Sequence, residues 1–85
     1  METTPGYYGL SSKIQLRELD NNRIGIYKVI KSRIIQKDAL KIIDIAAQIK
    51  SVDPALEVTL ICTRNICSKS IALLEREGVN LKIVD

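Results

Sequence analysis

The sequence has no histidine, and only two of its 85 residues are cysteine. The absence of histidine removes the commonest general base and the commonest metal ligand, and with them a large share of enzyme chemistry. Cys62 and Cys67 are too few for a disulfide scaffold, and no further cysteine or histidine is present to complete a zinc site with them. We therefore expect a protein that is not an enzyme and that holds no metal and no cofactor.

Long apolar runs and targeting signals are also missing. The longest apolar stretches fall far short of the ~20 residues that a membrane-spanning helix needs. Residues 1–6 lack the basic start and the apolar run of a signal peptide. These absences predict a cytoplasmic protein without membrane contact.

Phenylalanine and tryptophan are absent too, whereas fourteen isoleucines are present, so branched aliphatic side chains must fill the core. An apolar share of 46% and a charged share of 27% are typical of a globular protein, and the length suits one domain. Abundant isoleucine, lysine and glutamate are what a heat-adapted, archaeal source would supply.

Basic residues concentrate in the first half of the chain. Residues 13–50 carry nine lysines and arginines against four acidic residues, and between Arg23 and Lys41 the acidic residue is Asp38 alone. One basic band on a small domain suits a polyanion or an acidic protein surface, and the alternative is a solvated face that keeps a small protein soluble. The predicted nucleic-acid-binding residues of this band are Lys28, Lys31, Arg33, Lys37 and Lys41.

Residues 1–12 mix threonine, proline, glycine and serine without periodicity, which predicts a flexible arm ahead of a single domain at residues 13–85. Tyr7 and Tyr8 in this arm are candidate partner contacts, because a tyrosine ring offers a rigid face with a polar tip that stacks on a base or fills a pocket. The commoner alternative is that such a pair packs onto its own domain.

Polar and apolar residues alternate over residues 13–19 and 24–31, on either side of Asp20, Asn21 and Asn22. Asparagine and aspartate favour turns because they tolerate positive φ and their side chains bond their own backbone. The pattern predicts a β-hairpin.

A helix is predicted over residues 36–50, and Pro54 prevents it from continuing. Its polar stripe is narrow and consists of Lys37, Lys41, Asp44 and Gln48. The remaining apolar arc is wider than one sheet can cover. We therefore expect Ile45 and Ile49 to contact a partner or a second copy of the chain.

Three further elements follow in the second half of the chain. Residues 58–62 form a nearly continuous apolar run, which is typical of a strand buried on both faces. Residues 68–77 predict a second helix that ends at Gly78, and residues 79–84 predict a third core strand. The predicted fold is α/β, with the order β-β-α-β-α-β, two helices and a four-stranded mixed sheet in two or three layers.

The element order and three local segments resemble the core of restriction-endonuclease-like nucleases; these segments are residues 27–32, 60–72 and 77–81. In that superfamily two acids on neighbouring strands hold Mg²⁺, and a lysine two residues beyond the second acid assists. Lys31 matches the lysine, but Val29 occupies the position of the acid, and Glu18 or Asp20 would have to serve as the first. A single carboxylate beside several lysines does not hold a divalent metal. The resemblance therefore implies a degenerate nuclease fold without catalysis.

The loop and helix start at residues 63–70 suit an anion, because free N–H groups at a helix start attract negative charge and Arg64 and Lys69 add positive charge. The glycines of nucleotide-binding loops are absent, so a phosphate of a nucleic-acid backbone is the better candidate ligand. The plainer alternative is ordinary helix capping by Ser68. Cys67 lies where helix amides could lower the pKa of its thiol and make it nucleophilic.

The favoured interpretation is a non-catalytic accessory subunit of a DNA replication or repair complex, in contact with a larger protein (a polymerase, nuclease or helicase), with the nucleic-acid backbone, or with both. A self-associating interaction domain, with the apolar helix as its interface, is the second interpretation. The third is a small enzyme or ligand sensor that uses the loop around Cys67.

Overall fold

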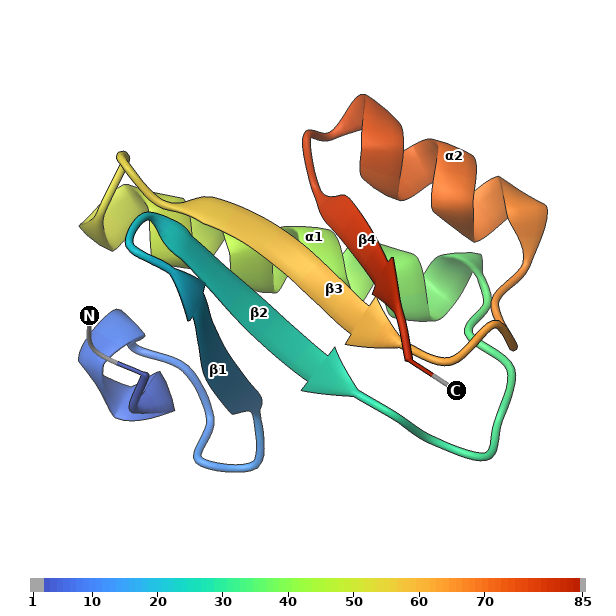
Figure 1. The fold of residues 1–85 in the computed structure, drawn as a ribbon, viewed down its shortest axis with the longest axis horizontal. Helices are drawn as coiled ribbons and strands as arrows, with labels where there is room; N and C mark the ends of the chain where they lie inside the picture. The colour runs from blue at the N-terminus through green and yellow to red at the C-terminus, as the bar shows by residue number, and fades with distance from the viewer. Residues whose placement is uncertain (1–2, 85) are drawn as a thin grey trace.

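The computed structural model describes residues 3–84 and contains a short 3-10 helix, two α-helices and four strands (Figure 1). In chain order these elements are η1 (Pro5–Tyr8), β1 (Gln15–Asp20), β2 (Arg23–Lys28), α1 (Gln36–Val52), β3 (Glu57–Cys62), α2 (Ser68–Arg76) and β4 (Asn80–Ile83). The strands form one sheet in the order β1-β2-β3-β4, in which β1 is antiparallel to β2 and the other pairs are parallel. The predicted α/β class, element order and mixed sheet are confirmed.

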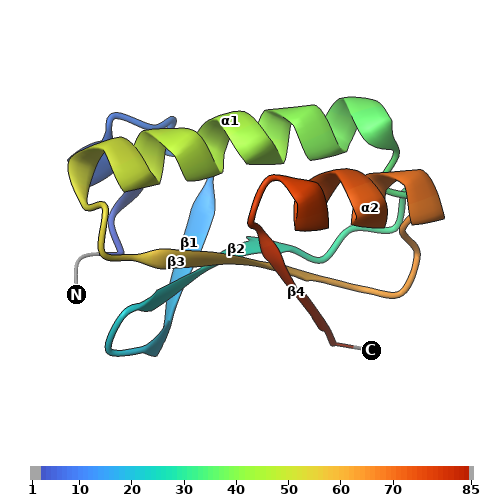
Figure 2. The same cartoon turned by 90° about the horizontal axis from the view of Figure 1, so that it is seen from above.

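The two helices lie on the same face of the sheet, so the domain has two layers (Figure 2). This follows from the strand order, because two successive crossovers of the same hand, each to the next strand along, place both helices on one side. The core between the layers consists mainly of aliphatic side chains. Its buried members include Ile24, Ile26, Val58, Leu60 and Cys62 from the sheet and Ala39, Ile42, Ala46, Ile49 and Leu74 from the helices.

The opposite face of the sheet carries no helix, yet Ile61 on that face is only 4% exposed. Gly25 leaves the space that the Ile61 side chain uses, since a Cβ added at Gly25 would lie 2.5 Å from Ile61 Cδ1. Beside it, the Arg17 guanidinium lies 4.0 Å from the centre of the Tyr27 ring, a cation–π contact. On the face of the sheet without a helix, Ile61 is therefore shielded by side chains of the sheet itself.

Two strands differ from the prediction, one in where it ends and the other in its position in the sheet. The second strand ends at Lys28 instead of continuing to residue 31, because the chain then turns away toward the pairing of Ile34 with Ile66. The last strand was predicted to be a core strand, but it lies at the edge of the sheet with one neighbour, and Ile83 is 45% exposed.

The N-terminal segment is part of the domain, in contrast to the flexible arm that its composition predicts. Residues Pro5–Tyr8 form η1, which Gly9 ends at a φ of 74°. Tyr8 is 2% exposed within the core, and the Gln48 side-chain amide of α1 donates a hydrogen bond of 2.9 Å to its carbonyl oxygen. The prediction that Tyr8 contacts a partner is thus wrong, because its ring fills the protein's own core; Tyr7 is 59% exposed.

We predict that Tyr8→Ala lowers the free energy of unfolding by about 3 kcal/mol or more, because it empties a buried aromatic position. Tyr7→Ala, the matched control, removes an exposed ring whose described contact is the edge-to-face approach to Tyr8, and should cost less than about 1 kcal/mol. Urea denaturation followed by circular dichroism measures both. Equal effects of the two substitutions would show that the N-terminal segment is not docked.

Candidate functional site

The sequence-predicted basic residues meet at one edge of the sheet, where the parallel strands β2 and β3 end and both helices begin (Figures 1 and 2). Lys28 closes β2, Lys31 and Arg33 lie in the connection to α1, and Arg64 lies in the connection from β3 to α2. Lys37 and Lys41 follow in the first two turns of α1, and Lys69 in the first turn of α2. We call these seven residues the basic edge: Lys28, Lys31, Arg33, Lys37, Lys41, Arg64 and Lys69.

Backbone pairing between the two connections holds the basic edge together. Ile34 and Ile66 form an isolated parallel bridge, in which Ile34 N–H donates to the Asn65 carbonyl at 2.9 Å and Cys67 N–H donates to the Ile34 carbonyl at 3.0 Å. The Asn65 side-chain amide also donates to the Lys31 carbonyl at 3.2 Å. Basic residues that are more than thirty positions apart in the sequence are thereby carried on two adjacent chain segments. The sequence analysis missed this link, because Ile34, Asn65 and Ile66 form no recognisable pattern in the sequence.

The basic edge has almost no acidic neighbours in the sequence segments that form it. Residues 28–41 and 63–69 hold these seven basic residues and one acidic residue, Asp38, while the rest of the chain holds six basic and nine acidic residues. The Asp38 carboxylate accepts the Ile35 N–H at 3.1 Å at the start of α1. Within residues 3–84, none of the five lysines of this edge, nor Arg33, forms an ion pair with an acidic side chain.

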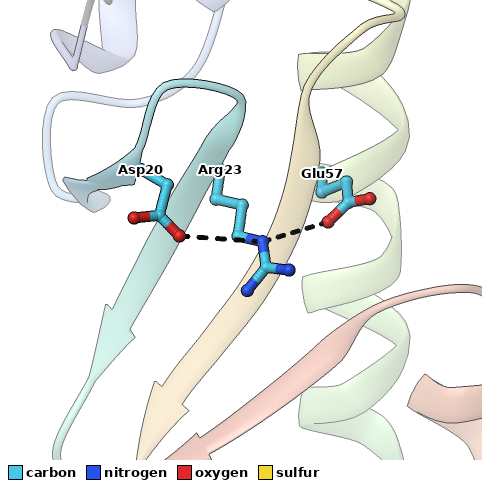
Figure 3. Close-up of polar contacts among 3 residues, drawn as sticks. All are labelled: Asp20, Arg23 and Glu57. Carbon is cyan, nitrogen blue, oxygen red and sulfur yellow. Dashed lines mark ion pairs between the residues drawn. The ribbon is translucent and has the colours of Figure 1, made fainter.

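At the opposite edge of the sheet, the charge of Arg23 is neutralised by two acidic side chains (Figure 3). Arg23, at the start of β2, lies between two carboxylates, with Nε 3.2 Å from Glu57 and 3.9 Å from Asp20. Both pairs are exposed to solvent, so each contributes little to stability. Their effect is to neutralise the charge of Arg23 at this edge.

Helix α2 begins at the basic edge with Cys67 as its capping residue. The Ser70 N–H donates to Cys67 Sγ at 3.4 Å, and the Ser70 hydroxyl oxygen lies 2.9 Å from the same sulfur. The predicted capping by Ser68 is therefore wrong by one residue, because Ser68 is already the first helical residue. Ser70 is fully buried, so its hydroxyl is held in place against the thiol.

The environment of Cys67 lowers the pKa of its thiol below the ordinary value. The hydrogen bond from the Ser70 hydroxyl is the largest cause, the Ser70 N–H is the second, and the positive charge of Arg33 acts in the same direction. Partial burial of the thiol opposes them. The predicted lowering by helix amides is confirmed in direction, although a side-chain hydroxyl that the sequence analysis did not consider is the main contributor.

The acidic residues of the nuclease-like interpretation lie far from the lysine they would have to join. Glu18 pairs with Ile24 and Asp20 with Arg23, at the start of β2, whereas Val29 and Lys31 lie beyond its end. The full length of β2 therefore separates these groups. Among residues 3–84, no three histidine, cysteine, aspartate or glutamate side chains lie close enough together to hold a metal ion.

The predicted partner-binding residues of α1 differ in their surroundings. Ile49 is fully buried in the core, so the prediction that it contacts a partner is wrong: it faces the sheet, which the width of the apolar arc alone did not reveal. Ile45 is half-buried and borders an open groove beside β1.

The described part of the chain also has no helix with the length and apolar character that a lipid bilayer requires.

Comparisons with protein-family models, with curated proteins and with solved structures find no match to this chain. The resemblance to restriction-endonuclease-like nucleases therefore depends on the sequence features described above.

We predict that Cys67 is alkylated by iodoacetamide with a pH midpoint below that of the same cysteine in urea, because the folded environment favours the thiolate. Ser70→Ala should raise the midpoint by removing the hydroxyl donor, and Arg33→Gln should raise it less. Cys62 is fully buried and should stay unmodified, which provides an internal reference in the mass spectrum. A folded midpoint equal to or above the unfolded one would contradict the prediction.

Proposed function

We propose that this protein is a non-catalytic accessory subunit of a DNA-processing complex, which holds the phosphate backbone of a nucleic acid on its basic edge. The observation that carries the proposal is the concentration of seven cations and one anion in the two chain segments that meet at that edge. Nucleic-acid backbones are densely charged polyanions, and the five lysines of this edge, which form no ion pair within residues 3–84, can displace the counterions of the phosphates that they bind.

The form of the edge favours backbone contact over sequence recognition. Its cations lie on two joined connections and at the starts of α1 and α2, instead of along one exposed helix face. Contacts to phosphates fix position without reading bases. The resemblance to restriction-endonuclease-like nucleases supports the assignment to DNA. Because this chain has Val29 in the position of the acid, a partner such as a polymerase, nuclease or helicase would supply the catalysis.

A self-associating interaction domain is the alternative, and a specific observation favours it. Several large aliphatic side chains are exposed, among them Ile35, Leu40, Ile83 and Val84. Exposed apolar groups on a small domain often mark an interface. Light scattering over a range of protein concentrations distinguishes the two functions, because a DNA-binding monomer keeps one mass whereas a self-associating domain does not.

We predict that the protein binds fluorescently labelled DNA with an affinity that falls steeply with salt, as measured by anisotropy. Lys31→Gln, Arg33→Gln and Lys69→Gln should each reduce the slope of log affinity against log salt by about one, since each removes one phosphate contact. Lys50→Gln and Arg76→Gln remove the same charge from the last turns of α1 and α2, at the opposite ends of the helices from the basic edge, and are the matched controls. The proposal is wrong if wild-type protein does not bind at low salt, or if the controls weaken binding as much as the edge variants.

We also predict that the purified protein does not cleave DNA or RNA with Mg²⁺ or Mn²⁺, because Glu18 and Asp20 lie at the opposite end of β2 from Lys31. Incubation of plasmid DNA and of RNA with the protein, followed by gel electrophoresis, measures this. Metal-dependent cleavage that Asp20→Ala abolishes would contradict the non-catalytic assignment.

A further inference from the structure

An open groove of about 680 Å³ lies between the start of β1, the end of β2 and the flank of α1. The N-terminal segment is held elsewhere on α1, where Gln48 donates to the Tyr8 carbonyl, and no residue of η1 lines the groove. Sequence analysis did not predict it, because its two walls come from residues 13–15 and from α1, which the sequence does not place side by side.

The groove is lined mainly by aliphatic side chains. Ile26 and Ile42 are buried at its base, Ile14 and Ile45 are half-buried, and Ile30 is 39% exposed at its rim. Val29, beside Ile30, is 38% exposed. Burial of such side chains against another apolar surface is favourable by roughly 25 cal/mol per Å². The surface therefore favours an occupant with aliphatic side chains, which a nucleic acid does not have.

The charged residues of the described chain that line the groove are three lysines: Lys13, Lys28 and Lys41. Within residues 3–84, no acidic residue lines the groove and none of the three lysines forms an ion pair. The remaining polar lining residues, Gln15 and Tyr27, are neutral. An occupant that carries carboxylates next to its aliphatic side chains would complement this surface.

The open form of the groove favours a peptide over a small molecule. Sites for small ligands bury roughly 70–90% of the ligand surface, whereas this groove has exposed rims at Lys13, Val29 and Ile30. A bound peptide needs to bury only one of its sides and can extend along the groove.

We propose that the groove binds an acidic segment of a partner protein, one in which aliphatic side chains fill the isoleucine-lined base and carboxylates contact the three lysines. The groove would then be the protein-docking surface of the proposed accessory subunit. The role of the partner rests on that proposed function. The groove argument itself depends mainly on the aliphatic lining and on Lys13, which are not part of the basic edge. Lys28 and Lys41 belong to both surfaces and are therefore left unchanged in the tests.

The test uses the full chain, ¹⁵N-labelled, and a synthetic peptide in which leucine and glutamate alternate; the control peptide has lysine in place of glutamate. We expect the acidic peptide alone to bind, with amide shifts at Ile14, Ile26 and Ile45. The proposal is overturned if neither peptide binds, if both bind equally, or if the shifts map elsewhere.

Two variants with matched controls locate the site further. Ile30→Ser should weaken peptide binding about tenfold through the loss of apolar contact, and Lys13→Glu about fivefold or more through charge reversal. Leu40→Ser and Lys82→Glu make the same changes at exposed positions outside the groove and should leave binding unchanged. Circular dichroism confirms that each variant is folded.

Two further measurements separate this proposal from its alternatives. Ile30→Ser should leave DNA affinity unchanged, and Lys31→Gln and Lys69→Gln should leave peptide affinity unchanged, so either proposal can fail without the other. If light scattering shows that the protein self-associates without peptide and that Ile30→Ser abolishes this, the occupant is a second copy and the partner-peptide proposal is wrong.

Discussion

The parallel pairing of β2 with β3 is the interaction on which the rest of the structure depends. It runs in register from Arg23 opposite Glu57 to Lys28 opposite Cys62, and the bridge between Ile34 and Ile66 extends it into the following connections. Because parallel strands end at the same edge, this one pairing brings together two basic segments that are distant in the sequence. It also fixes where α1 and α2 begin and separates Lys31 from Glu18 and Asp20. The proposed binding edge and the separation of Lys31 from these two carboxylates both follow from the same register.

Two surfaces share the lysines at the end of this pairing. Lys28 and Lys41 border both the basic edge and the groove beside β1, so a backbone bound at the edge and a segment bound in the groove would lie next to each other. The accessory role proposed for the protein needs such proximity, since a subunit that connects a nucleic acid to a larger protein contacts both at once.

Much of the fold could be predicted from the sequence because its signals are local. The alternation around Asp20, Asn21 and Asn22, the apolar run of β3 and the left-handed Gly78 each depend on neighbouring residues, and all were predicted correctly. The predictions that failed depended on tertiary contacts. Nothing in the composition of residues 1–12 indicates that Gln48 holds Tyr8 in the core, and helical periodicity does not show which side of the apolar arc the sheet takes, so Ile49 was misplaced. The groove joins residues 13–15 to α1, and only the folded chain brings them together.

The common direction of α1 and α2 has a consequence for how the molecule approaches a ligand. Both helices start at the basic edge, so the dipoles of their peptide groups are aligned and place their positive ends on the side that already carries the lysines. Toward the opposite edge, five carboxylates outnumber three cations; the carboxylates are Asp20, Asp53, Glu57, Glu75 and Glu77, and the cations are Arg23, Lys50 and Arg76. Backbone and side chains therefore add to one molecular dipole. On the proposed function, this dipole would turn the domain edge-first in the field of a polyanion before contact is made. Such steering acts on the rate of association, so salt should slow capture more than it hastens release.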